Sequence, residues 1–386
     1  MSHAFGFTVT DRRGRARSGE LMTAHGLVRT PAFMPVATRG AVKGVQHGDL
    51  IAAGTTILLA NTYHLHLRPG DDRIGRLGGL HRFVGWNLPM LTDSGGFQVY
   101  SLGALRRVDE EGVRFRSHLD GATHQLTPES AVDVQARLGA DIAMVLDECL
   151  AYPASEREVR TAVERTARWA ARARERFMAV RDGRVRVGAT NDQQAQFGIV
   201  QGGVLPAWRE ASVEAALAVG FEGYAIGGLS VGEPPALMYD IVEHTASGLP
   251  ADRPRYLMGV GTPVDLVESV ARGIDLFDCV LPTRNARNGQ LFTRNGRLNI
   301  KNARFADDER PPDPACGCPT CRTCSRAYLR HLFTVQEMNA ATLNSLHNLY
   351  FYLDTLSRVR EAIKFGSFEA FRQDFRRTYS SGSLES

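Results

Sequence analysis

The chain has 386 residues, of which 43% are hydrophobic and 23% charged, an ordinary composition for one large globular domain or two medium ones. Its 46 Lys plus Arg against 42 Asp plus Glu leave a formal charge of +4, too small by itself to indicate a nucleic-acid partner. The first seven residues lack the apolar run of a signal peptide, and no uncharged apolar stretch approaches the roughly 20 residues of a membrane helix. We therefore expect a cytoplasmic protein with no membrane partner.

A repeated pattern organises residues 32–278. An amphipathic stretch ends at a glycine, which fits a helix C-cap because glycine adopts the left-handed conformation without a Cβ penalty. A short apolar run follows, as in a parallel strand that is buried on both faces. Five such runs occur, at residues 57–60, 88–91, 142–146, 224–226 and 274–277, and three further runs, at 32–36, 196–201 and 256–259, complete a series of eight.

Helix starts fall between these runs. Thr127-Pro128 and Thr262-Pro263 each place a capping side chain before a proline at the first helical position. Residues 155–158, Ser-Glu-Arg-Glu, form a capping box that opens a long Arg/Ala-rich helix. Eight strands alternating with helices predict an α/β fold, a (β/α)8 TIM-type barrel. The alternative, a doubly wound open sheet, is less favoured because no Gly-rich dinucleotide fingerprint follows an early strand.

Two segments interrupt the alternation. Residues 99–126 carry turn signals between short alternating runs, which predicts β-hairpins inserted after the third strand. Residues 283–350 are basic, then Pro/Cys-rich, then helical, which predicts a zinc-binding subdomain. We expect a single catalytic unit made of a barrel with an N-terminal hairpin (1–282), a basic segment and zinc subdomain (283–350), a helical segment (351–379) and a flexible, disordered tail (380–386).

Polar residues and glycines follow six of the expected strands. The active sites of (β/α)8 barrels lie at the carboxyl ends of the strands. Any one of these residues is explained as a capping or loop residue, but the six together indicate a functional site. Two carboxylates that face one pocket suit glycosidic-bond chemistry, because one can attack the anomeric carbon while the other moves protons. The six positions are Asn61, Asp93, Asp147, Gln201, Gly228 and Asp278.

The same strand ends offer groups that can read a purine. Asp147 supplies a carboxylate and Gln201 an amide, which suit the hydrogen-bonding edge of such a base. The segment 227–229, Gly-Gly-Leu, can present backbone groups to it, and the glycines at 95 and 96 let backbone N–H groups approach a ligand closely. Cys149 is equally well explained as a small buried hydrophobe.

A cysteine cluster indicates a metal. Four of the six cysteines lie within nine residues, and in a reducing cytosol this favours metal binding over disulfides. The Cys-x-Cys-x-x-Cys segment 316–321 supplies three thiolates, and His347 or His331 can complete the set. A Cys3His set is a standard structural zinc site, and its four protein ligands leave no open position for catalysis. Cys324 is then a spare thiol.

A basic block lies next to the last predicted strand. Residues 283–305 contain six Arg or Lys and no acidic residue. Taken alone this is a solvated loop, but beside a glycosidic site a phosphate-binding surface is the better interpretation. His64 and His66 are not expected to bind a metal, because barrel hydrolases need further His and Asp ligands on other strands.

Seven segments and the cysteine cluster carry a family resemblance. In them the chain resembles the bacterial tRNA-guanine transglycosylases, also called queuine tRNA-ribosyltransferases, over nearly its whole length. The resemblance implies exchange of the wobble guanine of tRNAs with GUN anticodons for 7-aminomethyl-7-deazaguanine, in queuosine biosynthesis. It further implies double displacement through a covalent ribosyl-aspartate intermediate. The segments are residues 60–65, 93–98, 147–149, 198–202, 227–233, 256–261 and 278–284.

The resemblance implies a role for each site residue. Asp278 is the nucleophile on the ribose, and Asp93 is the general acid/base. The implied substrate-binding residues are Asn61, Ser94, Gly95, Gly96, Phe97, Asp147, Cys149, Gln201, Gly228, Leu229, Val231 and Met258. The implied tRNA-binding residues are Gly259, Val260, Gly261, Thr262, Pro263, Val264, Asp265, Thr283, Arg284, Asn285, Ala286 and Arg287. One structural Zn2+ per chain is implied at Cys316, Cys318, Cys321 and His347.

The resemblance also implies partners. These are the tRNA anticodon stem-loop, a 7-deazaguanine base and a second copy of the chain in a homodimer, with no redox or nucleotide cofactor. Two other classes of protein compete with this interpretation. A non-catalytic zinc-containing RNA-binding protein would leave Asp93 and Asp278 without a function. A barrel glycosidase acting on free sugars would leave the zinc set and the basic block unexplained.

Overall fold

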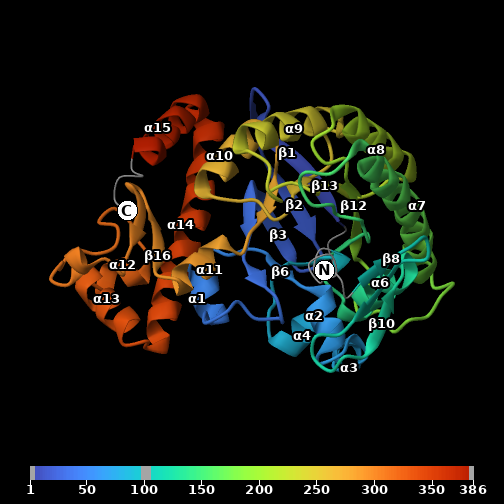
Figure 1. Cartoon of the computed structure of the whole chain (residues 1–386), viewed down its shortest axis with the longest axis horizontal. Coiled ribbons are helices and arrows are strands. Elements are labelled where there is room, and N and C mark those ends of the chain that lie inside the picture. The colour runs from blue at the N-terminus through green and yellow to red at the C-terminus, as the bar shows by residue number, and fades with distance from the viewer. Residues whose placement is uncertain (1–4, 97–105, 382–386) are drawn as a thin grey trace.

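The computed structural model describes residues 5–96 and 106–381, and its largest part is a barrel of parallel strands ringed by helices (Figure 1). All strand pairs in the barrel are parallel. The predicted (β/α)8 barrel is therefore confirmed. Around the sheet the order is β4 (Ala32–Met34), β15 (Leu276–Asp278), β14 (Arg255–Leu257), β13 (Gly223–Ile226), β12 (Ala195–Val200), β11 (Ile142–Met144), β7 (Met90–Thr92), β6 (Leu58–Ala60) and β5 (Val36–Ala37).

The first predicted strand, 32–36, is divided into two short strands. Pro35 separates β4 from β5, because proline has no N–H to donate to a ladder. β4 pairs with β15, whereas β5 pairs with β6. The two ends of the sheet thus meet at Pro35, which closes the barrel and excludes the doubly wound alternative.

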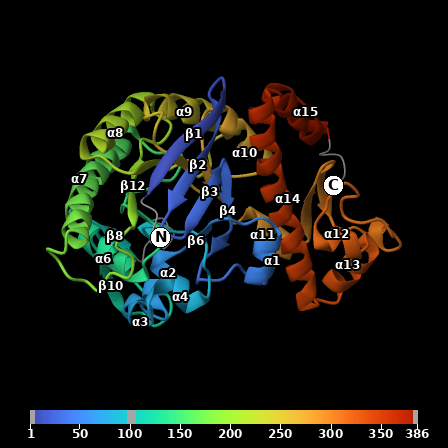
Figure 2. The ribbon, with the colours of Figure 1, turned by 180° about the vertical axis from the view of Figure 1, so that it is seen from behind.

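Three of the helices that surround the barrel, α6, α7 and α10, begin where the capping signals predicted. The side chains of Thr127, Ser155 and Thr262 each accept a hydrogen bond from the backbone N–H three residues later, and all three form capping boxes. The surrounding helices cover the outer face of the sheet (Figure 2). They are α1 (His47–Ala52), α2 (Thr62–Leu67), α3 (Asp71–Arg76), α4 (Gly79–Val84), α6 (Pro128–Leu138), α7 (Glu156–Arg181), α8 (Pro206–Val219), α9 (Pro235–Gly248) and α10 (Pro263–Ala271).

An N-terminal sheet packs on the barrel where its strands begin. The expected hairpin is a three-stranded antiparallel sheet of β1 (Gly6–Arg13), β2 (Ala16–Thr23) and β3 (Gly26–Thr30). Arg17 donates from Nε to Asp275, which precedes β15, at 2.9 Å. Asp141, which precedes β11, accepts from the backbone N–H groups of His25 at 3.1 Å and Met90 at 2.8 Å. The carboxyl ends of the strands stay uncovered by this sheet.

The insertion after the third strand position is a small antiparallel sheet. It consists of β8 (Arg106–Val108), β9 (Val113–Arg116) and β10 (Thr123–Leu126), as the predicted hairpins require. Phe115 and Leu126 of this sheet are buried in a cluster with Tyr63 and Trp169 of the surrounding helices. Residues 99–105 of the predicted insertion lie outside the described residues.

A C-terminal unit stands beside the barrel, and α14 runs between the two (Figure 1). The predicted boundary at 350/351 falls inside α14, because residues 338–365 contain no Gly or Pro and the helix ends only at Gly366. The predicted tail overlaps the end of α15, and residues 382–386 lie outside the described part. The unit comprises α11 (Leu281–Arg287), β16 (Gln290–Thr293), β17 (Gly296–Asn299), η2 (Ala303–Phe305), α12 (Pro319–Thr323), α13 (Arg326–Thr334), α14 (Met338–Phe365) and α15 (Phe368–Ser381).

Length alone does not make these helices candidates for crossing a membrane. α7 has 26 residues and carries charged side chains along its length, and α14 has 28 and carries charged side chains from Asp354 onward. Within residues 5–96 and 106–381, none of the helices is both long and apolar enough to span a bilayer.

Candidate active site

A cavity of about 420 Å3 opens at the carboxyl ends of the barrel strands. Its volume suits a small-molecule ligand such as a purine base. Asp93 and Asp278 both line it, and so do all the predicted substrate-binding residues except Phe97, which lies outside the described residues. Those lining residues are Asn61, Ser94, Gly95, Gly96, Asp147, Cys149, Gln201, Gly228, Leu229, Val231 and Met258.

Hydrogen bonds hold Asp93 in place directly after β7. Its Oδ1 accepts from the backbone N–H of Thr62 at 2.9 Å and of Gly95 at 3.2 Å. Its Oδ2 accepts from Asn61 Nδ2 at 2.5 Å. The same Asn61 side chain caps α2, since its Oδ1 accepts from the backbone N–H of His64 at 3.0 Å. The helix cap and the carboxylate are therefore fixed by a single residue.

The electrostatic surroundings of Asp93 favour its neutral form. Burial raises the pKa of Asp93 to about 7, and the negative charges of Asp278 and Asp147 act in the same direction. The bonds from Thr62 and Gly95 oppose this rise. A carboxyl group with a pKa near neutrality can both give and take a proton at physiological pH, which is what a general acid/base requires.

Asp278, at the end of β15, is held by one of its two oxygens. Oδ1 accepts from the hydroxyl of Tyr256 at 2.6 Å and from the backbone N–H of Gly259 at 2.7 Å. Within the described residues, no hydrogen bond falls on Oδ2, so that oxygen is available to a ligand. Burial raises the pKa of Asp278, and these two donors oppose the rise. The pKa of Tyr256 is raised well above its usual value, so its hydroxyl remains a donor.

Asp147 and Gln201 form a second polar pair on the cavity wall. Gln201 donates from Nε2 to Asp147 Oδ2 at 2.6 Å, and the hydroxyl of Ser94 lies 3.4 Å from Oδ1. Burial raises the pKa of Asp147 to about 6. Gly228 has a φ of +67°, and a Cβ there would lie 2.3 Å from Gln201 Oε1. Only glycine therefore lets the chain pass so close to the amide.

Two residues, one on the cavity wall and one behind it, have structural roles that the sequence did not reveal. The sequence places Tyr256 in an expected strand and in a segment of the family resemblance, but its bond to Asp278 depends on two strands being neighbours in the barrel. Glu233 accepts from the backbone N–H groups of Ser230 and Val231, the latter at 3.0 Å, and so fixes the loop that forms one wall. The spacing of three residues from Ser230 to Glu233 is the only signal for it in the sequence.

The two predicted tRNA-binding segments, 259–265 and 283–287, flank Asp278 at the mouth of the cavity. Arg284 is exposed and lines the cavity, and Arg287 is partly exposed. Neither has a carboxylate partner among the described residues. Thr262 and Asp265 are partly exposed and cap α10, whereas other members of these segments are buried and do not face the mouth. The buried members are Val260, Gly261, Pro263, Thr283 and Ala286.

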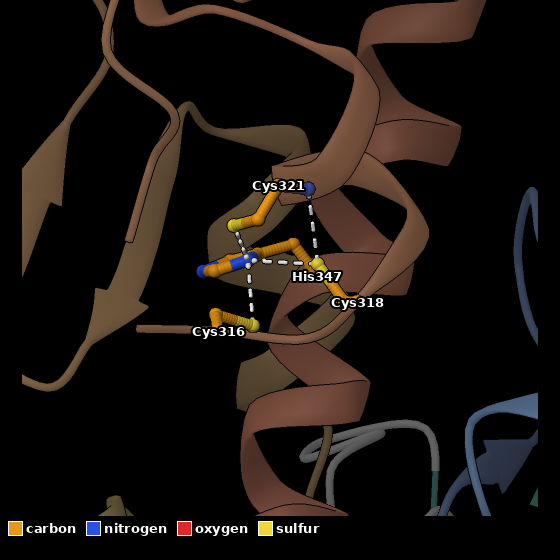
Figure 3. A group of neighbouring side chains, drawn as sticks. All are labelled: Cys316, Cys318, Cys321 and His347. Atoms are coloured by element: carbon orange, nitrogen blue, oxygen red, sulfur yellow. Dashed lines mark hydrogen bonds between the residues drawn. The ribbon is translucent and has the colours of Figure 1, made fainter. Parts of the chain in front are cut away.

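The predicted zinc ligands come together in the C-terminal unit (Figure 3). His347 Nδ1 lies 3.9 Å from the sulfur of Cys316, 3.4 Å from that of Cys318 and 3.2 Å from that of Cys321. Tetrahedral zinc with thiolate and imidazole ligands separates sulfur from nitrogen by about 3.5 Å. His347 Nε2 lies 2.8 Å from the carbonyl of Phe292, which leaves Nδ1 free to bind a metal. The cluster can therefore hold a metal ion.

The other candidate ligands lie elsewhere. His331 does not join the cluster, and neither His64 nor His66 belongs to a group of potential metal ligands within residues 5–96 and 106–381. His66 instead contacts Asp71 at 2.6 Å. Cys324 is buried in a hydrophobic cluster of the C-terminal unit, as expected for a thiol that packs rather than binds metal.

The fold and the cavity define a barrel enzyme equipped for chemistry at a glycosidic bond. The sequence profile of one family, described as queuine tRNA-ribosyltransferase, matches residues 11–381. Relatives of that name include proteins of Nitratidesulfovibrio vulgaris, 53% identical over 97% of both chains, and Cereibacter sphaeroides, 50% identical over 100% of both chains. The chain belongs to this family, and it is an enzyme of the pentosyltransferase class. This membership excludes the free-sugar glycosidase and the non-catalytic RNA-binding protein.

Proposed function

We propose that the protein is a tRNA-guanine transglycosylase that exchanges the wobble guanine of tRNAs with GUN anticodons for 7-aminomethyl-7-deazaguanine, in queuosine biosynthesis. The observation that carries the proposal is one cavity in which Asp93 and Asp278 face the base-reading pair Asp147 and Gln201. The names of the relatives support tRNA as the substrate.

Recognition of the base follows from the donors and acceptors of the cavity wall. The target nucleotide leaves the stack of the anticodon loop and enters the cavity. The Asp147 carboxylate accepts from the N1–H and the exocyclic amine of guanine, while the Gln201 amide and the Gly228 N–H are suited to its O6. The side chains of Leu229 and Met258 frame the ring. These atoms are common to guanine and 7-deazaguanines, so one wall serves both the leaving and the entering base.

The first displacement transfers the ribose to the enzyme. Asp278 Oδ2 attacks C1′ of the ribose, and a carbon–oxygen bond forms as the bond from C1′ to N9 of guanine breaks. The electron pair of the broken bond passes to N9, which takes a proton from the neutral carboxyl of Asp93. The products are free guanine, a ribosyl ester of Asp278 and an ionised Asp93.

The second displacement reverses these roles. Asp93, now a carboxylate, takes the N9 proton of the entering 7-deazaguanine, and that nitrogen attacks C1′. The ester bond breaks and its electron pair returns to Asp278. Each turnover leaves both carboxyl groups as they began, so the exchange needs no redox or nucleotide cofactor.

We also propose where the larger partners bind. Arg284 and Arg287 are suited to phosphates of the anticodon stem-loop, because neither is neutralised by a carboxylate among the described residues. The enzyme acts in the cytoplasm as a homodimer, for which exposed apolar side chains at the junction of α13 and α14 offer a contact. Those side chains are Tyr328, Val335 and Met338.

The direct test is incorporation of radiolabelled guanine into unmodified tRNA that has a GUN anticodon. We expect label to enter that tRNA, and none to enter the same tRNA with its wobble guanine replaced. Label found in neither tRNA, or equally in both, would exclude the proposed exchange.

Zinc should be present at one ion per chain and should be structural. Cys318→Ser removes one thiolate of the closed set, so we expect loss of the metal and a melting temperature lowered by several degrees, because metal binding contributes to folding. Elemental analysis and thermal melting measure both effects. Cys324→Ser is the matched control and should retain the metal, since Cys324 packs away from the cluster. If elemental analysis finds no zinc in the purified wild-type protein, the assignment of a zinc site is refuted.

Val231 should set selectivity for the substituent at position 7 of the base. Val231 lines the cavity, and its side chain would occupy space that the cyclopentenediol of queuine needs. Overpacking costs about 1–3 kcal/mol, so we expect queuine to be used about 10- to 100-fold less efficiently than 7-aminomethyl-7-deazaguanine. Val231→Gly should reduce that preference while guanine exchange persists. The measurement is incorporation of each base into tRNA, and equal use of both bases by wild type would show that Val231 does not limit the pocket.

A further inference from the structure

Arg209 of α8 is a fully buried guanidinium that forms no ion pair with the described residues, although the charge of Glu233 favours its cationic form. Its exposed fraction is 0%, although arginine is almost never fully buried unless it is paired. Arg17, which is also buried, follows the usual rule and pairs with Asp275. Among the described residues, Arg209 has no ion pair, and its Nη2 has no hydrogen-bond partner. Burial lowers the pKa of Arg209 to about 10, so the group remains cationic at neutral pH.

The three side-chain hydrogen bonds of Arg209 to described residues all go to backbone carbonyls beneath the base-reading wall. Nε donates to Gly203 at 2.9 Å, and Nη1 donates to Val200 at 3.0 Å and to Gly227 at 2.9 Å. Val200 is the last residue of β12, and Gly227 directly follows β13. Nη1 thus links β12 and β13 at the point where the hydrogen-bonded pairing of these two strands ends.

The orientation of one of these peptides determines what the cavity offers to a base. The peptide bond between Gly227 and Gly228 is trans, so its C=O and its N–H point in opposite directions. Because the carbonyl of Gly227 is bound to Arg209, the N–H of Gly228 points away from α8, and Gly228 lines the cavity. The buried cation therefore fixes a hydrogen-bond donor at the cavity wall.

The other two bonds fix the neighbourhood of Gln201. Val200 and Gly203 flank it on both sides in the sequence, and both are held by Arg209. Gly202 has a φ of +135°, and a Cβ there would lie 2.7 Å from the backbone nitrogen of Arg209. Glycine at this position lets the loop lie directly against α8. The Gln201 side chain, which bonds Asp147, is thus carried by a loop anchored on Arg209.

We propose that Arg209 is a positioning residue for base recognition, which orients the Gly228 N–H and the Gln201 amide toward the 6-oxo group of guanine. The inference rests on the proposed exchange of guanine. Arg209 itself touches no substrate. Its removal should weaken recognition of the base edge and leave the tRNA-binding surface around Arg284 unchanged.

The test compares Arg209→Lys with a matched control, Arg255→Lys. Lysine keeps the charge but cannot bond all three carbonyls in the same geometry. Arg255 also donates to backbone carbonyls, those of Leu249 and Pro250, and burial likewise lowers its pKa to about 10. It lies at the beginning of β14, the opposite end of the barrel from the cavity.

For Arg209→Lys we expect the KM for guanine to rise about tenfold, and the KM for tRNA to change less than about twofold. 2-Aminopurine lacks the 6-oxo group, so its Ki as a competitor should rise much less than the KM for guanine. The ratio of that Ki to the guanine KM should therefore fall about tenfold, a change that general destabilisation would not produce. Arg255→Lys should leave all three constants within about twofold of wild type.

Three results would overturn the inference. The KM for guanine could be unchanged in Arg209→Lys, or the KM values for guanine and tRNA could rise together while the ratio of the 2-aminopurine Ki to the guanine KM stays the same. The third is that Arg255→Lys shows the pattern expected of Arg209→Lys. If Arg209→Lys does not fold, Gly202→Ala displaces the backbone of Arg209 from the loop side and should lower the ratio in the same direction. An unchanged ratio in that folded variant would also overturn it. Failure of the wild type to incorporate guanine would instead refute the proposed function.

Discussion

Replacing Asp278 by asparagine should reduce base exchange by about 10³-fold or more and leave the barrel folded. The amide oxygen of asparagine can still accept from Tyr256 and Gly259, which both bond a single oxygen of the native carboxylate. What is lost is the anionic oxygen that forms the ribosyl ester. The loss therefore reports on nucleophilic attack rather than on local structure.

The measurement pairs initial rates of guanine incorporation with a search for a covalent tRNA adduct on denaturing gels. Wild type should form an adduct that maps to Asp278, and Asp278→Asn should form none. Binding of free guanine is the internal control, and it should stay within a few-fold of wild type because Asp147 and Gln201 are untouched. Turnover within tenfold of wild type, or an adduct that maps to Asp93, would remove Asp278 from the role of nucleophile.

The barrel could be predicted because its information is local and periodic. Five of the eight short apolar runs follow a glycine, four of these five end at a polar residue, and this pattern survives shifts of one or two residues at strand ends. The break at Pro35 marks where the sheet closes on itself, which depends on pairing with strands distant in sequence. The predicted boundary at 350/351 does not divide α14, because residues 338–365 contain no Gly or Pro that would end a helix there.

The residues that face the cavity could also be anticipated, since every strand end of a barrel reaches the same rim. The residues that support the cavity wall from behind could not be anticipated from the sequence. Arg209 lies on α8 with no motif around it, and its role depends on the ends of β12 and β13 lying side by side. The bond of Tyr256 to Asp278 has the same origin. Sequence patterns identify groups at the rim, whereas their supports are set by three-dimensional packing.

Asp93, Asp147 and Asp278 all line one cavity, and the charge on one carboxylate raises the pKa of another. The charges of Asp278 and Asp147 help to raise the pKa of Asp93, whereas the Tyr256 hydroxyl and the Gly259 N–H oppose the rise that burial causes at Asp278. An ionised Asp278 therefore helps Asp93 to keep its proton. This is the assignment that a nucleophile and a general acid need before the first displacement.

A bell-shaped pH dependence of kcat/KM for tRNA should follow. The free enzyme needs Asp278 ionised and Asp93 protonated, so the rate should rise as pH passes the pKa of Asp278 and fall as pH passes about 7, the value to which the pKa of Asp93 is raised. Above that pH the fall should approach tenfold per unit. The midpoints of the two limbs are apparent pKa values of the coupled pair Asp93 and Asp278, because the charge on each carboxylate alters the pKa of the other.

The entering base should show the opposite dependence, because it reacts with the ribosyl-enzyme. There Asp93 must be a carboxylate, and esterification has removed the charge of Asp278 that helped to raise its pKa. We therefore expect kcat/KM for the base to rise with pH to a plateau, with its midpoint below that of the falling tRNA limb. Asp93→Ala should lower both constants by about 10²–10⁴-fold and abolish the limb near pH 7. If the limb near pH 7 persists in Asp93→Ala, another group carries the proton. The same conclusion would follow if kcat/KM for tRNA and kcat/KM for the base changed in the same direction with pH near pH 7.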